Sequence, residues 1–182
     1  MGHTQGPAGR VLAAVAPQRA GARRVELTWP EMTLAAIKGV VRHVSAVKAG
    51  RQAQYGVPPE RAWQAHIEGA LGECGVAKDR NRYWSAMVGE VRPGDVGRLE
   101  VRATTHLHGH LIVYPKDPDR APFVLVVGVA PRLWVVGWLR GGAAKQTQWW
   151  RERDGEGLRV RWPAFFVPQE ALEDVATLPG GW

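Results

Sequence analysis

Cysteine is nearly absent from this chain of 182 residues, and long apolar runs are missing altogether. The single cysteine, Cys74, excludes an internal disulfide and any zinc site that needs several thiolates. No apolar stretch approaches the roughly 18 residues that cross a bilayer, and no charged start leads into an apolar signal core. We therefore expect a cytoplasmic protein with no membrane partner, in which Cys74 is a buried structural thiol rather than a nucleophile.

Acidic residues are missing from the first 25 positions, although the whole chain carries a net charge of +7. Residues 1–51 contain eight Lys or Arg against two acids, whereas the rest of the chain contains 16 against 15. Because residues 1–24 are basic and rich in Gly, Ala and Pro, we expect a disordered tail there and a single domain over residues 25–182. The tail is interpreted either as a solvated extension or as an arm that contacts phosphate.

Two helices are predicted in the first half of the chain. Thr28 and Glu31 have the spacing of a capping box, and a helix from about residue 29 to about residue 52 follows it. Its buried stripe is expected to consist of apolar residues at helical spacing: Leu34, Ile37, Val41, Val44 and Val47. The same periodicity predicts a second helix from about residue 60 to about residue 80.

Beyond Tyr83 the periodicity changes to that of strands, separated by clusters of Gly, Pro and Asp. Five strands are predicted, over residues 86–91, 98–104, 111–114, 122–129 and 132–139. A short helix over about 142–153 and an extended segment over 162–168 follow them. We therefore expect an α/β (α+β) fold in which a mixed five-stranded sheet is flanked by helices and preceded by an N-terminal helix.

Acidic residues gather at the start of the second predicted strand. Glu100 and Arg102 share one strand face, so both side chains can reach a cleft while their neighbours enter the core. Asp95 is five positions before Glu100, and the glycine turn between them must bring it back to the same side. Two carboxylates held together in this way favour a divalent cation such as Mg²⁺. Glu73, at the margin of the apolar face of the second helix, is better placed to join them than Glu68, which points further toward solvent.

The order of Glu73 on a helix, then Asp95, then Glu100-Val101-Arg102 resembles the PD-(D/E)XK nuclease superfamily, which has the restriction-endonuclease-like fold. Residues 28–172, about four-fifths of the chain, are also similar to small phage-type proteins that carry this core. The resemblance implies that the three acids hold Mg²⁺ or Mn²⁺ for hydrolysis of phosphodiester bonds in DNA. It also implies that Arg102 contacts the transferred phosphate.

Arg102 departs from the family pattern, because it stands where the resemblance expects Lys. Arginine stays protonated and cannot act as a base, although it can stabilise charge on a phosphate. Two functions therefore stay open. One is an active nuclease; the other is a catalytically inactive nucleic-acid-binding or phage accessory interaction protein of the same fold.

Several residues outside the acidic site are further candidates. The predicted DNA contacts are basic residues of the tail and of the first helix: Arg23, Arg24, Lys38, Arg42 and Lys48. A solvated helix face is the other interpretation of the last three. His106, His108 and His110 alternate, so on a strand they would share a face able to bind a transition metal, with His110 nearest the cleft; a polar hairpin is the alternative. The oligomeric state stays open, with a homodimer as one alternative.

Overall fold

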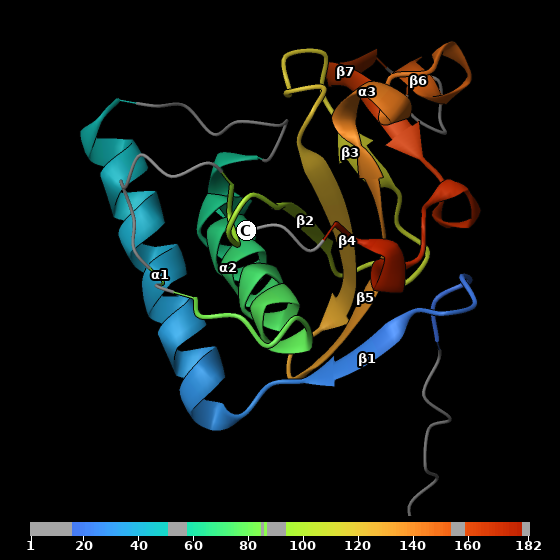
Figure 1. Cartoon of the computed structure of the whole chain (residues 1–182). Coiled ribbons are helices and arrows are strands. Elements are labelled where there is room, and N and C mark those ends of the chain that lie inside the picture. Colours follow the sequence, from blue (N-terminus) through green and yellow to red (C-terminus); the bar gives the residue numbers. More distant parts are fainter. Residues whose placement is uncertain (1–15, 51–57, 85, 87–93, 154–158, 180–182) are drawn as a thin grey trace, which may run out of the picture.

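The chain folds into helices and two β-sheets, as Figure 1 shows. The structure is a computed structural model that describes residues 16–50, 58–84, 86, 94–153 and 159–179. Helix α2 (Ala62–Asp79) lies between helix α1 (Trp29–Lys48) and the strands. The predicted α/β class is therefore confirmed. None of the described helices is long and apolar enough to cross a bilayer.

The strands form two sheets. The first has four strands in the order β1 (Arg23–Glu26), β5 (Arg132–Arg140), β4 (Pro122–Val129) and β2 (Glu100–Thr104). In this sheet β2 runs parallel to β4, and the other neighbours are antiparallel. The second sheet is antiparallel, in the order β3 (Leu111–Val113), β7 (Arg159–Val167) and β6 (Trp150–Arg153). The prediction of one five-stranded sheet is wrong because β3 pairs with β7, a strand far away in the sequence.

Most predicted strands are found near their predicted bounds, but the late helix is not. The strand predicted over residues 86–91 lies mostly outside the described residues. Of the helix predicted over about 142–153, only the short α3 (Gly141–Ala144) is present, and β6 begins at Trp150. Two glycines begin α3 and weaken it as a helix, while Trp150 pairs with Phe165 of β7.

Strand β1 corrects the predicted start of the ordered chain. Residues 1–15 of the predicted disordered tail lie outside the described residues. Arg23 and Arg24, however, are the first two residues of β1 and pair with β5. Upstream of them, the Gln18 backbone N–H donates a hydrogen bond to Gln169 Oε1 at 3.1 Å. The domain therefore begins before Val25, and a truncation that ends at residue 24 would remove half of a strand.

Strand β4 lies at the centre of the molecule and is buried on both faces. Val124 and Val126 belong to a hydrophobic cluster that includes residues of α2. Phe123, Leu125 and Val127 belong to a second cluster, which includes residues of β3 and β7. The first sheet is therefore covered by α2 on one face and by the second sheet on the other. Helix α1 packs outside α2 as a further layer (Figure 1).

Helix α1 begins as predicted but buries a different face. The capping box of Thr28 and Glu31 is present, and the helix ends at Lys48 rather than near residue 52. The predicted buried stripe is wrong, because all five of its residues are exposed: Leu34, Ile37, Val41, Val44 and Val47. The residues that α1 buries are instead Ala35, Lys38 and Gly39.

A close approach between the two helices explains this reversal. A Cβ atom on Gly39 would lie 2.6 Å from the Cα atom of Ile67, so the backbones of α1 and α2 nearly touch there. A large aliphatic side chain cannot fit between backbones at this distance. The small residues therefore mark the packing face of α1, and its large apolar residues point away from α2.

Candidate functional site

Glu73 of α2 forms the centre of a buried ion cluster. Its Oε2 atom is 2.6 Å from Lys38 Nζ, and its Oε1 atom is 2.5 Å from Arg42 Nη2. The carboxylate and the ammonium group are both buried, and Lys38 also lies over the ring of Trp84 at 4.7 Å from the centroid. Both oxygens of Glu73 are therefore already engaged by cations of α1.

This cluster changes the roles predicted for three residues. The expectation that Lys38 lies on the surface as a DNA contact is wrong, since the side chain is buried against Glu73. Arg42 is half-buried and donates to the same carboxylate. Glu73 lies near the other acids, as expected, but its oxygens are engaged, so we assign it a role in orienting α1 on α2 and not in holding a metal.

Asp95 lies in the turn that leads into β2. Val96 and Leu99 form an isolated bridge in this turn, and Oδ2 of Asp95 accepts a hydrogen bond from the Val101 backbone N–H at 2.8 Å. Among the described strands, β2 is at the end of the first sheet, and the Asp95 side chain supplies a partner for this N–H. Burial, and then the negative charge of Glu73, raise the pKa of the Asp95 carboxyl.

Glu100 is the first residue of β2 and lies near Asp95. Leu99 and Val101 on either side of it are buried, as the strand alternation predicts. Burial raises the pKa of the Glu100 carboxyl, and the charge of Asp95 raises it further, while Arg102 acts in the opposite direction. The turn therefore does bring the two predicted acids into electrostatic contact, at the edge of the first sheet.

Arg102 is held by an acid that the sequence did not single out. Its Nη2 atom is 2.9 Å from Asp117 Oδ2, its Nη1 atom is 3.8 Å from Glu100 Oε2, and its guanidinium carbon lies 4.9 Å from the centroid of the Phe123 ring. Asp117 also accepts a hydrogen bond from the Tyr114 backbone N–H. The sequence signal for Asp117 was the turn PKDPD, which indicates a local bend and not a contact with β2.

The carboxylates of this region are candidate ligands for a divalent cation. Among the described residues, no group of three or more His, Cys, Asp or Glu side chains is placed to hold one metal ion. Burial nevertheless disfavours the ionised state of both Asp95 and Glu100, and nearby negative charge adds to this, from Glu73 at Asp95 and from Asp95 at Glu100. A divalent cation relieves both penalties, and Mg²⁺ is bound through one or two carboxylates with water and phosphate oxygens. In chemical type, Asp95 and Glu100 are therefore donors that suit Mg²⁺ or Mn²⁺.

The remaining predicted DNA contacts are only partly available. Arg23 Nε is 2.9 Å from Asp79 Oδ1, and Arg24 Nη2 is 3.1 Å from Glu26 Oε2, although both arginines are partly exposed. Lys48 is exposed at the end of α1. These residues do not form one continuous basic surface with Lys38 and Arg42, because the latter two face α2.

The three histidines do not share a strand face. His106 and His108 are exposed in the loop before β3, where the Gly109 N–H donates to the His106 carbonyl oxygen. His110 is exposed and lies beside the ring of Phe166 on β7. The segment is therefore a turn, which agrees with the polar-hairpin interpretation and not with a shared strand face. Cys74, by contrast, is buried as predicted, and burial raises the pKa of its thiol to about 11.

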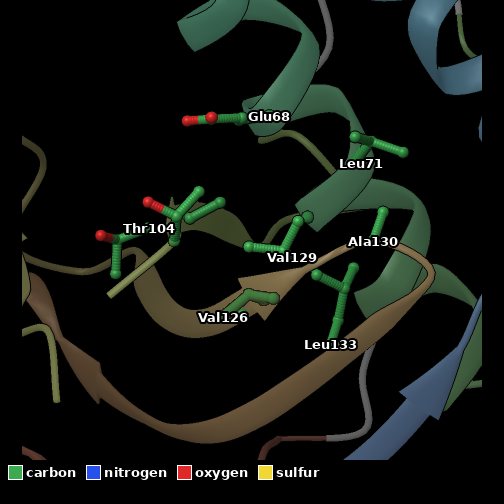
Figure 2. A pocket seen from close by; sticks show the side chains of 11 residues that line it. Glu68, Leu71, Thr104, Val126, Val129, Ala130 and Leu133 are labelled. Atoms are coloured by element: carbon green, nitrogen blue, oxygen red, sulfur yellow. The ribbon is translucent and has the colours of Figure 1, made fainter. Parts of the chain in front are cut away.

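Glu68 lines a cavity away from the acid pair. This cavity of about 220 Å³ lies between α2 and the far end of β2, and its walls are largely apolar (Figure 2). Thr104 and Val126 line it together with Glu68, whose Oε1 atom accepts a hydrogen bond from Gln64 at 2.6 Å. Glu100 is at the opposite end of β2 from Thr104. Glu68 is therefore not part of the acidic site.

Comparison of the chain with protein families, with curated proteins and with solved structures finds no match. The resemblance to the PD-(D/E)XK superfamily thus stays a prediction from the order of the motifs. What the structure adds is the arrangement of side chains at the edge of β2. Any function assigned to this region must follow from that arrangement.

The raised pKa values of Asp95 and Glu100 predict how stability depends on pH. The ordinary pKa values of these two carboxyls are 3.8 and 4.5, and both are raised in the folded chain. The folded chain therefore binds these two protons more tightly than the unfolded chain. Their contribution to stability is therefore present below about pH 4 and is lost as the pH rises through the folded-state pKa values. The free energy of unfolding of wild type and of Asp95→Asn can be measured in urea between about pH 4 and about pH 8. It should decline less with rising pH in the variant than in wild type. Equal declines would contradict the predicted effect of burial.

Proposed function

We propose that the chain is a metal-dependent nuclease that hydrolyses phosphodiester bonds in DNA. Asp95 and Glu100 are the carboxylates that hold Mg²⁺ or Mn²⁺, and Arg102 is the phosphate contact. The observation that carries this proposal is the half-buried pair of carboxylates with raised pKa at the edge of β2, with a guanidinium group beside it. Buried acids of raised pKa next to a fixed cation are a common feature of catalytic sites.

The chain's own contacts support distinct roles for the three residues. Asp95 is oriented through Oδ2 by the Val101 N–H, which fixes the direction of the rest of the carboxylate. Arg102 is held by Asp117 and by the ring of Phe123, so its guanidinium group is positioned before any substrate binds. When bound, a divalent cation supplies Lewis acidity and activates water for attack on phosphorus. Arg102 then stabilises charge that develops on the phosphate oxygens.

A restriction-endonuclease-like core is part of the same proposal. In its favour, a glutamate on a helix, an aspartate in a turn and the Glu100-Val101-Arg102 strand come together in one region. The connection between β2 and β4 differs from the helical crossover that usually joins parallel strands. Between the parallel strands β2 and β4, the described chain passes through β3 and contains no helix.

Metal removal tests the proposal directly. Purified chain incubated with single-stranded or double-stranded DNA is expected to cleave at least one of them in Mg²⁺ or Mn²⁺. Cleavage should stop when EDTA removes the metal and return when the metal is restored in excess, because the carboxylate pair needs the cation. Heat-unfolded chain serves as a control for contaminating nucleases that survive heating. Cleavage that persists in EDTA would contradict a role for the metal.

A second candidate function has one observation in its favour. Arg102 donates to Asp117, so part of its hydrogen-bonding capacity is used within the protein. An arginine held in this way can contribute to a binding surface without taking part in turnover. In that case the same assay would show retention of DNA on the chain and no cleavage in either metal, and the chain would be a catalytically inactive nucleic-acid-binding protein.

A further inference from the structure

The outer face of α1 is apolar over nearly the whole length of the helix. It consists of six exposed aliphatic residues: Leu34, Ile37, Val40, Val41, Val44 and Val47. Ile37 and Val47 are 55% and 63% exposed. Trp29, which is 82% exposed, lies at one end of this face, and Trp63 of α2 lies against His43 at its margin. We call these eight residues the α1 face.

The size of the α1 face matches a protein interface. Monomeric proteins rarely expose contiguous apolar patches beyond a few hundred Å². With two tryptophans and six aliphatic residues exposed by roughly 40% or more, the α1 face presents on the order of 800 Å². A stable complex buries about 800 Å² on each partner. The α1 face alone is therefore large enough to hold two chains together.

We infer that the α1 face binds a second copy of this chain, with the two α1 helices antiparallel across a twofold axis. The spacing of the six aliphatic residues supports this arrangement. In an isologous antiparallel pair, each position of one helix faces a position of the other whose number adds to a constant. A constant of 81 pairs Leu34 with Val47, Ile37 with Val44 and Val40 with Val41, so every aliphatic residue faces another one.

The charges around α1 agree with the same pairing. The α1 face carries no charged residue, because Lys38 and Arg42 point to Glu73 on the opposite side of the helix. Two copies can therefore meet without repulsion between like charges. An antiparallel arrangement also places the carboxyl end of each helix, with Lys48, near the amino end of its partner, where Trp29 is exposed. Opposed helix dipoles and a cation–π contact both favour this arrangement.

Oligomeric mass tests the inference. Wild-type chain in analytical ultracentrifugation is expected to sediment with the mass of two chains, and Val41→Glu with the mass of one, because a buried charge would then lie next to the twofold axis. The matched control is Val129→Glu, since Val129 is 65% exposed and lies at the end of β4, away from α1. Circular dichroism of both variants shows whether α1 stays folded.

Cysteine crosslinking tests the direction of the pairing, and the native Cys74 is buried and does not interfere. A mixture of Leu34→Cys and Val47→Cys chains should form disulfide-linked dimers on mild oxidation, whereas Leu34→Cys alone should not. A wild-type chain that sediments as one copy would overturn the inference. So would a Val41→Glu chain that remains dimeric, or crosslinking of Leu34→Cys with itself, which a parallel pair would produce.

Discussion

Replacing Glu73 by glutamine is expected to destabilise the folded chain by about 3–5 kcal/mol, the usual effect of breaking a buried ion pair from one side. The reason is the environment of Lys38, whose ammonium group is buried and 2.6 Å from Glu73 Oε2. Glutamine keeps the shape of the side chain but leaves this cation without a compensating negative charge. Urea denaturation of the two proteins at neutral pH measures the difference in the free energy of unfolding.

Two further variants show whether the ion pair is the cause. Glu68→Gln makes the same chemical change on the same helix, one and a half turns away, and should alter the free energy of unfolding by less than about 0.5 kcal/mol. Adding Lys38→Met to Glu73→Gln removes the uncompensated cation and should recover much of the loss. A Glu73→Gln chain as stable as wild type would show that Glu73 does not stabilise the packing of α1 on α2.

Replacing Glu100 by glutamine is expected to abolish Mg²⁺-dependent cleavage of DNA, with a loss of at least about a hundredfold in rate. In the proposed nuclease, the change removes one of the two negative charges that would hold the cation, while the shape of the site is kept. Binding of DNA should stay the same or become tighter, because repulsion between the carboxylate and phosphate is removed. The measurement is the initial rate of cleavage in Mg²⁺ and in Mn²⁺, together with the dissociation constant for DNA in EDTA.

The same variant should be more stable than wild type at neutral pH. Burial and the charge of Asp95 raise the pKa of Glu100, so the ionised carboxylate costs stability above that pKa, and glutamine does not. Glu170→Gln serves as the control, since Glu170 is exposed and belongs to a short helical turn near the carboxyl end of the chain. Equal cleavage by wild type and Glu100→Gln would end the nuclease proposal, whatever their stabilities.

The parts of the fold that depend on residues adjacent in the sequence were predictable from the sequence. The capping box at Thr28 and the bounds of β4 are as predicted, because each depends on a few adjacent side chains and on strand alternation. The packing face of α1 was not predictable from periodicity alone. Hydrophobicity assigns Leu34 and its neighbours to the interior, whereas the contact of Gly39 with Ile67 depends on a helix that lies far along the chain.

Strand β5 gives a second example of a tertiary effect. Trp134 and Trp138 are four positions apart and should share a face of a regular strand. They belong to different hydrophobic clusters, because the register against β4 shifts between Leu125 and Val126. A bulge of this kind adds one residue and reverses the faces beyond it. The local mark of the reversal is Gly137, which pairs with Leu125 at the shift, since an isolated glycine inside a strand is typical of a bulge.

The candidate site was also predictable only where its residues are close together in the sequence. Asp95, Glu100 and Arg102 lie within eight residues, so a turn and a strand are enough to bring them together. Asp117 and the cations that surround Glu73 come from other elements, and only the folded chain shows them as partners. The sequence thus indicated which acids are near one another, but not which of them are already neutralised.

The layered arrangement has a consequence for hydrogen exchange. Helix α1 rests mainly on α2, whereas β4 is enclosed on both faces, so α1 can open locally while the sheets remain closed. Amide protons of β4 should therefore exchange only when the whole molecule unfolds, and those of α1 much sooner. Each opening of α1 separates Lys38 from Glu73, so the exchange rate of this helix reports how often the buried carboxylate of Glu73 loses its cation.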